Sequence, residues 1–153
     1  MREDTTRRAV ARAMHLLEKQ DMTEGRLREK LKKSEYSEED IEEAIAYVKS
    51  YHYIDDMRYC LNFIDYNSSS KSRIRIKQDL IKRGADKETI AAAFEESEAI
   101  DEESQIMKWL EKKHFVEVAD DEKERYRIYS FLMRKGYKTS DILKAMDRAK
   151  ADY

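Results

Sequence analysis

The chain has 153 residues, a length that suits one domain or a few small helical units stacked together. Charged residues make up 42% and apolar residues 41%, with no proline and three glycines, which favours helices over sheets and excludes a disordered chain. The net charge of −2 argues against strong binding of nucleic acid by the chain as a whole.

The single cysteine, Cys60, excludes an intramolecular disulfide and fits a reducing compartment. No apolar run approaches the roughly 20 residues that a membrane span needs. We therefore expect a soluble, monomeric, cytoplasmic protein with no membrane association.

The first fifty residues predict three helices. Residues 1–5 are polar and expected to fray, and a helix is expected from about Thr6 to Gln20. One face of it carries apolar residues at i, i+3, i+4 and i+7, namely Val10, Ala13, Met14 and Leu17. Thr23 then caps a second helix, and Ser37 with Asp40 resembles the capping box of a third. The inward residues of these two are Leu27, Leu31, Ile41, Ala44, Ile45 and Val48.

The same plan returns twice. A helix from about Asp56 precedes a serine-rich joint, a basic helix ending at Gly84, and a helix capped by Asp86. A last set begins near Asp101. In that set Asp120 or Asp121 caps the middle helix, which ends at Gly136, and Thr139 or Ser140 caps the final helix.

The repeat is visible in the spacing of apolar residues. Three pairs are each ten residues apart, at Leu31–Ile41, Leu80–Ile90 and Leu132–Ile142, so the unit recurs after 49 and then 52 residues. Such small units must stack to bury apolar surface. We predict an all-α fold of three tandem three-helix repeats in an elongated, curved molecule, with boundaries at 6–54, 55–99 and 100–153.

Catalytic and metal-binding patterns are absent from the sequence. The histidines His15, His52 and His114 are scattered, and no glycine-rich phosphate loop occurs. We expect no enzyme activity, no metal and no cofactor. Asp55 and Asp56 are interpreted as helix-capping residues, Cys60 as a buried inert thiol, and Trp109 as part of the core.

The basic helix is the strongest candidate for function. Between residues 71 and 83 there are six basic residues and one acid, Asp79. Ile76 and Leu80 are assigned to the core. Two explanations fit the cations: an acidic partner, such as a phosphate backbone or an acidic protein surface, or internal pairing with the acidic segment 95–103. The serine joint before this helix is expected to be flexible.

Three stretches resemble motifs of the RecX family, the regulators of the RecA recombinase. Ile54-Asp55-Asp56-Met57-Arg58-Tyr59 is similar to its central L/I-D-D-x-R-F/Y run. Ser72-x-x-Arg75-Ile76-x-x-Asp79-Leu80-x-x-x-Gly84 resembles a second motif, in which the family commonly has glycine and Glu where this chain has serine and Asp79. Residues 129–137 resemble the motif of the last repeat, with Lys135 in place of arginine.

The resemblance implies a protein that is not an enzyme and lies in the helical groove of the RecA–DNA filament. Such proteins inhibit ATP hydrolysis, strand exchange and co-protease activity, and thereby regulate recombinational DNA repair and the SOS response. They also bind DNA weakly on their own. The alternatives are a direct DNA-binding protein that uses the basic helix 71–83, and a helical scaffold. The expected contact residues are Arg58, Lys71, Arg73, Arg75, Lys77, Lys82 and Arg83.

Overall fold

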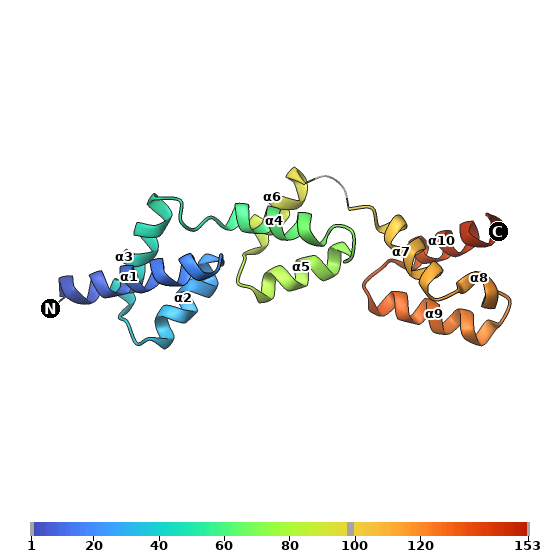
Figure 1. Cartoon of the computed structure of the whole chain (residues 1–153), viewed down its shortest axis with the longest axis horizontal. Coiled ribbons are helices and arrows are strands. Elements are labelled where there is room, and N and C mark those ends of the chain that lie inside the picture. The colour runs from blue at the N-terminus through green and yellow to red at the C-terminus, as the bar shows by residue number, and fades with distance from the viewer. Residues whose placement is uncertain (1, 98–99, 153) are drawn as a thin grey trace. The chain divides into compact units, whose positions relative to one another are not determined.

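The computed structural model describes residues 2–97 and 100–152, which form ten α-helices and no strand (Figure 1). The expected all-α fold is confirmed. None of the described helices combines the length and apolar content that crossing a membrane requires. The helices are α1 (Arg2–Lys19), α2 (Glu24–Lys33), α3 (Glu38–Ser50), α4 (Asp56–Asn67), α5 (Arg73–Lys82), α6 (Lys87–Glu96), α7 (Glu102–Lys112), α8 (Phe115–Val118), α9 (Glu122–Arg134) and α10 (Thr139–Ala151).

Contacts divide the described residues into two compact units. Unit 1 comprises α1 to Phe63 together with Asp79–Ser97, and unit 2 comprises Ile64–Gln78 together with the chain from Ile100 onward. Helices α4 and α5 therefore contribute residues to both units. The elongated, curved shape and the boundaries 6–54, 55–99 and 100–153 stay predictions.

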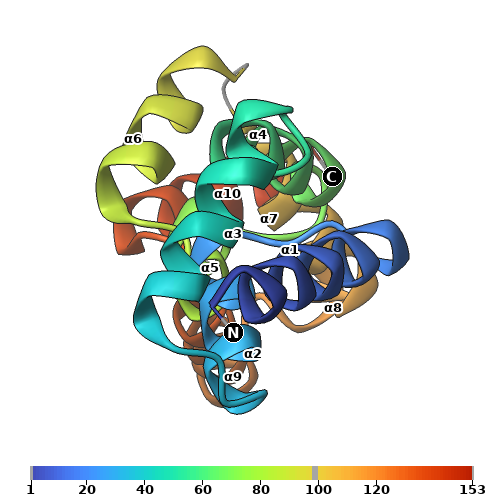
Figure 2. The ribbon, with the colours of Figure 1, turned by 90° about the vertical axis from the view of Figure 1, so that its left-hand side faces the viewer.

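In unit 1, α1, α2 and α3 pack on one another around a common apolar core (Figures 1 and 2). The prediction for the start of α1 was wrong, because the helix begins at Arg2 rather than Thr6. A hydrogen bond of 2.7 Å from the Thr6 hydroxyl to the buried Asp40 carboxylate ties this first part of α1 to α3. Of the predicted inner face of α1, Ala13 is buried and Val10 and Leu17 pack half-buried against the core, whereas Met14 is 37% exposed. Ala9, which was not predicted, is also fully buried.

The N-caps follow the local sequence closely. The side chains of Thr23, Ser37 and Asp86 accept hydrogen bonds from backbone N–H groups in the first turns of α2, α3 and α6, as expected. In the last repeat, Asp121 rather than Asp120 caps α9. The prediction that Thr139 or Ser140 caps α10 was wrong: both lie inside the helix, and Lys138 precedes it without a side-chain cap.

The described residues form one helix more than the nine that three three-helix repeats predict, and the additional helix lies in unit 2. The short α8 packs against α7, α9 and α10 (Figure 1). Its Phe115 is 1% exposed in the core of this unit. The left-handed conformation of His114, with φ 56°, turns the chain between α7 and α8. The change from a 49-residue to a 52-residue spacing lies in α9, which has 13 residues where α2 and α5 have 10.

A hydroxyl group joins the middle helices of the first two repeats, within unit 1. Thr23, the N-cap of α2, accepts a hydrogen bond from the Arg26 N–H and donates one to the carbonyl of Arg83 at the end of α5. The next residue, Gly84, has φ 96°, and a Cβ there would lie 2.7 Å from the Thr23 hydroxyl. Glycine is therefore required both by the left-handed backbone and by the close approach.

The same arrangement joins the second and third repeats, within unit 2. Ser72, the residue before α5, accepts from the Arg75 N–H and donates to the carbonyl of Lys135 over 2.8 Å. Gly136 follows, again with φ 96°, and a Cβ there would lie 2.7 Å from the Ser72 hydroxyl. Each repeat junction is thus built from a hydroxyl at one helix start and a glycine at another helix end.

Candidate partner-binding surfaces

Residues from the first helix of each following repeat complete the two junctions. The Asp56 carboxylate accepts a hydrogen bond of 2.8 Å from the N–H of Glu24 at the start of α2, and the Glu102 carboxylate accepts one of 3.1 Å from the N–H of Arg73. The aspartate pair therefore caps two helices. Asp55 caps its own helix through the Arg58 N–H, whereas Asp56 caps α2. This use of Asp56 in another repeat was not predicted.

The environment around Asp56 raises the pKa values of two groups in unit 1, the Asp56 carboxyl and the Cys60 thiol. Burial, followed by repulsion from Glu24 and Asp86, raises the pKa of Asp56, and the hydrogen bond from the Glu24 N–H opposes that rise. Burial also raises the pKa of the Cys60 thiol to about 11, with the carboxylates of Asp56 and Asp86 adding to the effect. Cys60 is fully buried and held in the protonated form at neutral pH, which agrees with an inert core thiol.

The basic helix has the buried side that the sequence predicted. Ile76 and Leu80 are completely buried, while Arg73, Arg75, Lys77, Lys82 and Arg83 are exposed and Lys71 is half-buried. The helix also exposes two isoleucines, Ile74 at 48% and Ile81 at 42%. These apolar side chains were missed, although their spacing of three and four residues from Lys77 places them with it on one helix face.

Two of the expected contact residues are engaged within unit 1. Arg83 donates a hydrogen bond of 2.8 Å to the Tyr59 hydroxyl, and its guanidinium lies 4.9 Å from the centre of the Phe63 ring. Arg58 donates to the carbonyl of His52 over 3.2 Å and lies 3.9 Å from a carboxylate oxygen of Asp21. Both arginines therefore hold parts of the fold as well as facing solvent.

The acidic segment 95–103 approaches the start of the basic helix in unit 2. Asp101, Glu102 and Glu103 line a cleft together with Arg73. Glu102 accepts from the Arg73 backbone, and Glu103 forms an ion pair with Arg148. Internal contact with the acidic segment thus occurs at Arg73, through its backbone N–H, and residues 98 and 99 of that segment lie outside the described part.

The serine joint before α5 is held by a buried side chain. Gln105, which is 3% exposed, donates hydrogen bonds of 2.7 and 2.9 Å to the carbonyls of Ser68 and Lys71. Its own carbonyl accepts from the Tyr137 hydroxyl over 2.7 Å. Because buried polar groups are costly to leave unpaired, this network opposes the flexibility that the serine content suggested.

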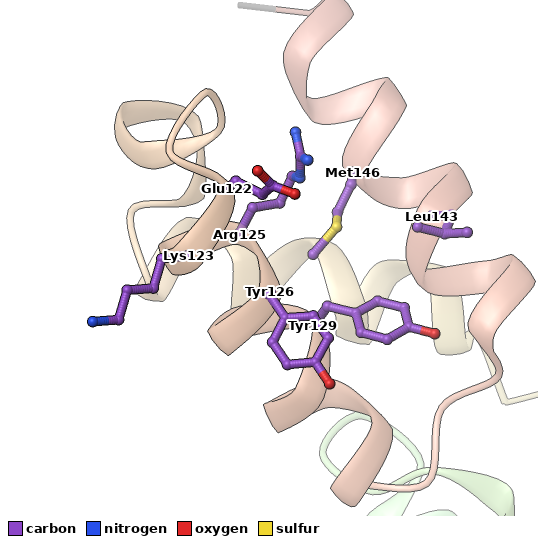
Figure 3. A pocket seen from close by; sticks show the side chains of 7 residues that line it. All are labelled: Glu122, Lys123, Arg125, Tyr126, Tyr129, Leu143 and Met146. Atoms are coloured by element: carbon purple, nitrogen blue, oxygen red, sulfur yellow. The ribbon is translucent and has the colours of Figure 1, made fainter.

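A shallow apolar groove of about 750 Å³ lies between α9 and α10 in unit 2 (Figure 3). Tyr126 and Tyr129 stack with ring centres 6.3 Å apart, and Leu143 and Met146 face them from α10. The Lys123 side chain points away from these residues. Glu122 and Arg125 complete the lining of the groove.

Lysines and aromatic rings gather at a second surface of unit 2, which we call the lysine–aromatic patch. It consists of Trp109 and Lys112 from α7, Lys113 directly after α7, Phe131 from α9 and Lys135 directly after α9. The two rings meet edge to face with centres 5.0 Å apart, and both are half-buried. The expectation that Trp109 is simply a core residue was therefore incomplete, because its ring also forms part of this surface.

Metal-binding groups do not cluster in the part of the chain that the structure describes. No set of three or more His, Cys, Asp or Glu side chains within residues 2–97 and 100–152 is arranged to hold a metal ion. The described features that stand out are instead surfaces: the exposed face of α5, the apolar groove and the lysine–aromatic patch.

Comparison with known proteins identifies each repeat. Family models described as the first, second and third three-helix domains of RecX match residues 9–47, 55–93 and 101–146. A protein named Regulatory protein RecX from Clostridium acetobutylicum is 30% identical over 145 residues, which cover 92% of this chain and 68% of that protein. A protein of the same name from Cronobacter sakazakii is 32% identical, with 88% of each chain covered.

Solved structures agree with the fold. The crystal structure of RecX from Lactobacillus salivarius matches with a TM-score of 0.80 at 20% identity, over 95% of this chain and 97% of that one. At such low identity, this likeness establishes the fold alone. The chain spans about two thirds of the length of the clostridial relatives. The family models match each of the three repeats, and the named relatives match the chain along most of its length. These sequence matches show that this protein belongs to the RecX family.

Proposed function

We propose that this protein is a non-catalytic modulator of the RecA recombinase. In this proposal it binds the RecA–DNA filament along its helical groove and inhibits ATP hydrolysis, strand exchange and co-protease activity. It thereby regulates recombinational DNA repair and the SOS response in the cytoplasm. Membership of a family whose curated members are named regulatory proteins supports this role.

The composition of the exposed face of α5 carries the proposal. Ile74 is half-exposed between Arg73 and Arg75, and Lys77 lies one turn further along the helix. A surface made only to meet phosphates needs cations, whereas a protein interface combines apolar side chains with cations at its edge. A filament groove offers both protein and DNA, so the mixed face of α5 fits it.

The test is inhibition of RecA ATP hydrolysis on single-stranded DNA. We expect Arg73→Ala, Arg75→Ala and Lys77→Ala together to weaken inhibition at least about tenfold, since a combined loss of about 1.4 kcal/mol from the three charged contacts gives that change. The matched control replaces Lys123, Lys138 and Lys144 by alanine, which removes the same charge from exposed positions elsewhere in unit 2. Full inhibition by the folded α5 variant would refute the role of this helix.

Direct DNA binding by the basic helix 71–83 is a second candidate, favoured by the exposure of five of its cations. The two functions differ in what the protein needs. Binding to naked duplex DNA that falls steeply with salt and is lost in the α5 variant indicates phosphate contacts by this helix, whereas tight binding to duplex only in the presence of RecA indicates the modulator. Ile74→Ser separates them further, because it should weaken a protein contact and leave phosphate contacts unchanged.

A further inference from the structure

We infer that the lysine–aromatic patch of unit 2 binds single-stranded nucleic acid, with bases on the rings of Trp109 and Phe131 and phosphates on the surrounding lysines. This site is distinct from the basic helix α5. It requires no recombinase, so its test is independent of the proposed function.

The geometry of the lysines is the first observation. The Lys113 ammonium lies 4.3 Å from the centre of the Phe131 ring, and the Lys112 ammonium lies 5.3 Å from that of Trp109. The Lys135 ammonium lies 5.1 Å from the centre of the Trp109 ring and 5.3 Å from that of Phe131. Three exposed ammonium groups therefore surround two half-buried rings, although the chain as a whole carries a net charge of −2.

The pairing of these lysines is the second observation. Within the described part of the chain, Lys112, Lys113 and Lys135 form no ion pair with a carboxylate. Cations at the C-terminal ends of helices complement the helix dipole, and this accounts for lysines at the ends of α7 and α9. It does not account for two helix ends bringing three of them to the same pair of aromatic rings.

Comparison with the second repeat shows which groups of the patch are shared between repeats and which occur only in the third. In the second repeat, Arg83 and Phe63 stand at the positions that Lys135 and Trp109 hold in the third. Arg83 lies over the Phe63 ring as Lys135 lies over the Trp109 ring, so a cation on this ring is part of the shared fold. The positions of Phe131, Lys112 and Lys113 are occupied in the second repeat by Asp79, Tyr66 and Asn67. The third repeat therefore adds one ring and two cations to the shared pair.

These groups match the chemistry of a single strand. Unpaired bases stack on aromatic side chains, while lysines bind the backbone phosphates between them. Stacking of a base on an aromatic ring is stronger than an exposed cation–π contact, so a base can displace a lysine, which then meets a phosphate. An acidic protein surface would use the lysines but leave the rings without a partner, and duplex DNA keeps its bases stacked inside.

Trp109 provides the measurement, because it is the only tryptophan of the chain. The full-length protein is titrated with oligo(dT) of about 15 nucleotides at about 50 mM salt, conditions in which short single strands bind basic aromatic surfaces. We expect saturable quenching of Trp109 fluorescence. A duplex of the same length should quench much less.

Charge variants identify the site. Lys112→Gln, Lys113→Gln and Lys135→Gln together should weaken oligo(dT) binding at least about tenfold and reduce the slope of log K against log salt by about 2, at about 0.7 per phosphate contact. The control, Lys123→Gln, Lys138→Gln and Lys144→Gln, has the same net charge and should bind as the original protein does. Phe131→Leu, with folding checked by circular dichroism, should weaken binding while leaving the salt slope unchanged.

The inference would be overturned by no quenching by oligo(dT), by equal quenching by duplex, by equal loss in both lysine triples, or by equal binding of poly-glutamate. The last would assign the patch to an acidic protein partner. Loss of binding in the α5 triple, with the patch triple unaffected, would place nucleic acid on the basic helix instead.

Discussion

The junction around Thr23 and Gly84 in unit 1 and the junction around Ser72 and Gly136 in unit 2 share their hydrogen bonds but differ in how closely the backbones approach. In unit 1, a Cβ on Gly25 would lie 2.6 Å from the Gly84 carbonyl oxygen. The same position in unit 2 is Ile74, whose side chain is half-exposed. The repeated hydrogen bonds determine how the repeats are joined. The residue at the position of Gly25 and Ile74 determines whether a side chain is present on the surface beside the joint.

The polar groups around the two junctions also differ. Unit 2 holds its serine joint through the buried Gln105, whereas the same repeat position in unit 1 is Tyr59, whose hydroxyl accepts from Arg83 at the surface. Shared joints therefore tolerate different surroundings. Substitutions at Gln105, at the glycines and at Asp56, with their matched controls, test which parts of this comparison determine stability.

The largest effect is expected from Gln105→Leu. It removes hydrogen bonds to the Ser68 and Lys71 carbonyls and to the Tyr137 hydroxyl, and we expect a loss of about 3 kcal/mol or more in the free energy of unfolding. Urea unfolding followed by Trp109 fluorescence measures it. Tyr59→Phe, the counterpart in unit 1, should cost under about 1 kcal/mol because it removes one exposed bond. Equal losses would contradict the difference between the units.

Alanine at the two junction glycines should come next, with unequal costs. Both sites have left-handed φ, so strain and the clash with the hydroxyl apply to each. At Gly84 the added Cβ would also lie 3.0 Å from the Arg26 backbone nitrogen, whereas at Gly136 its next neighbour is 3.7 Å away. We expect losses of about 3 kcal/mol for Gly84→Ala and about 2 kcal/mol for Gly136→Ala.

A second variant makes this prediction sharper. Ser72→Ala removes the hydroxyl with which the new Cβ at position 136 would clash. Its combination with Gly136→Ala should therefore cost less than the sum of the two single changes. Thermal unfolding by circular dichroism supplies the three values, and strict additivity would show that the hydroxyl does not limit the approach.

Gly25→Ala should reverse the usual helix preference. Alanine normally stabilises a helix by about 1 kcal/mol relative to glycine, but here the Cβ would meet the Gly84 carbonyl. We expect a net loss of about 1–2 kcal/mol, the size of a moderate packing clash. Ile74→Ala, the matched change in unit 2, should alter stability by less than about 1 kcal/mol. A stabilised Gly25→Ala protein would show that the repeats are not in close contact there.

The smallest effect concerns pH and Asp56. Because the folded state raises the pKa of this carboxyl, folding favours its protonated form, and its contribution to stability falls as pH rises from the ordinary aspartate range through the raised pKa. Asp56→Asn keeps an oxygen that accepts from the Glu24 N–H. We expect it to be neutral or stabilising by less than about 1 kcal/mol at pH 7 and to flatten this part of the pH profile. A destabilised variant would show that the charge itself holds α2.

Sequence patterns predicted the local features of the fold. Caps at Thr23, Ser37 and Asp86 need only a side chain and an N–H two or three residues away, so the signal is contained in a few letters. The inward positions Ile76 and Leu80 follow from helical periodicity in the same way. The prediction that Thr139 caps α10 failed because Lys138 occupies the N-cap position. The Thr139 hydroxyl instead contacts the Tyr129 hydroxyl and the Met133 sulfur.

Contacts between distant residues were beyond the reach of local patterns. The second hydrogen bond of Thr23 joins residues sixty positions apart, and Asp56 caps a helix in another repeat. The patch around Trp109 depends on two helix ends meeting, which periodicity does not specify. The sequence feature that points to the patch is the 52-residue offset between repeats. This offset aligns Lys135 with Arg83, and each of them directly precedes a glycine.

The hydroxyl–glycine junction also bears on self-assembly. A head-to-tail contact that repeats without closing produces an open fibre, and a protein made of stacked repeats carries that hazard at its two ends. The N-cap of the third middle helix is Asp121, whose carboxylate has no hydrogen to donate. The first middle helix is followed by Glu35 at φ 66°, a residue that carries the Cβ that Gly84 and Gly136 lack at the corresponding positions. An end-to-end joint between two copies would therefore lack both the hydroxyl and the glycine that form the joints between the chain's own repeats.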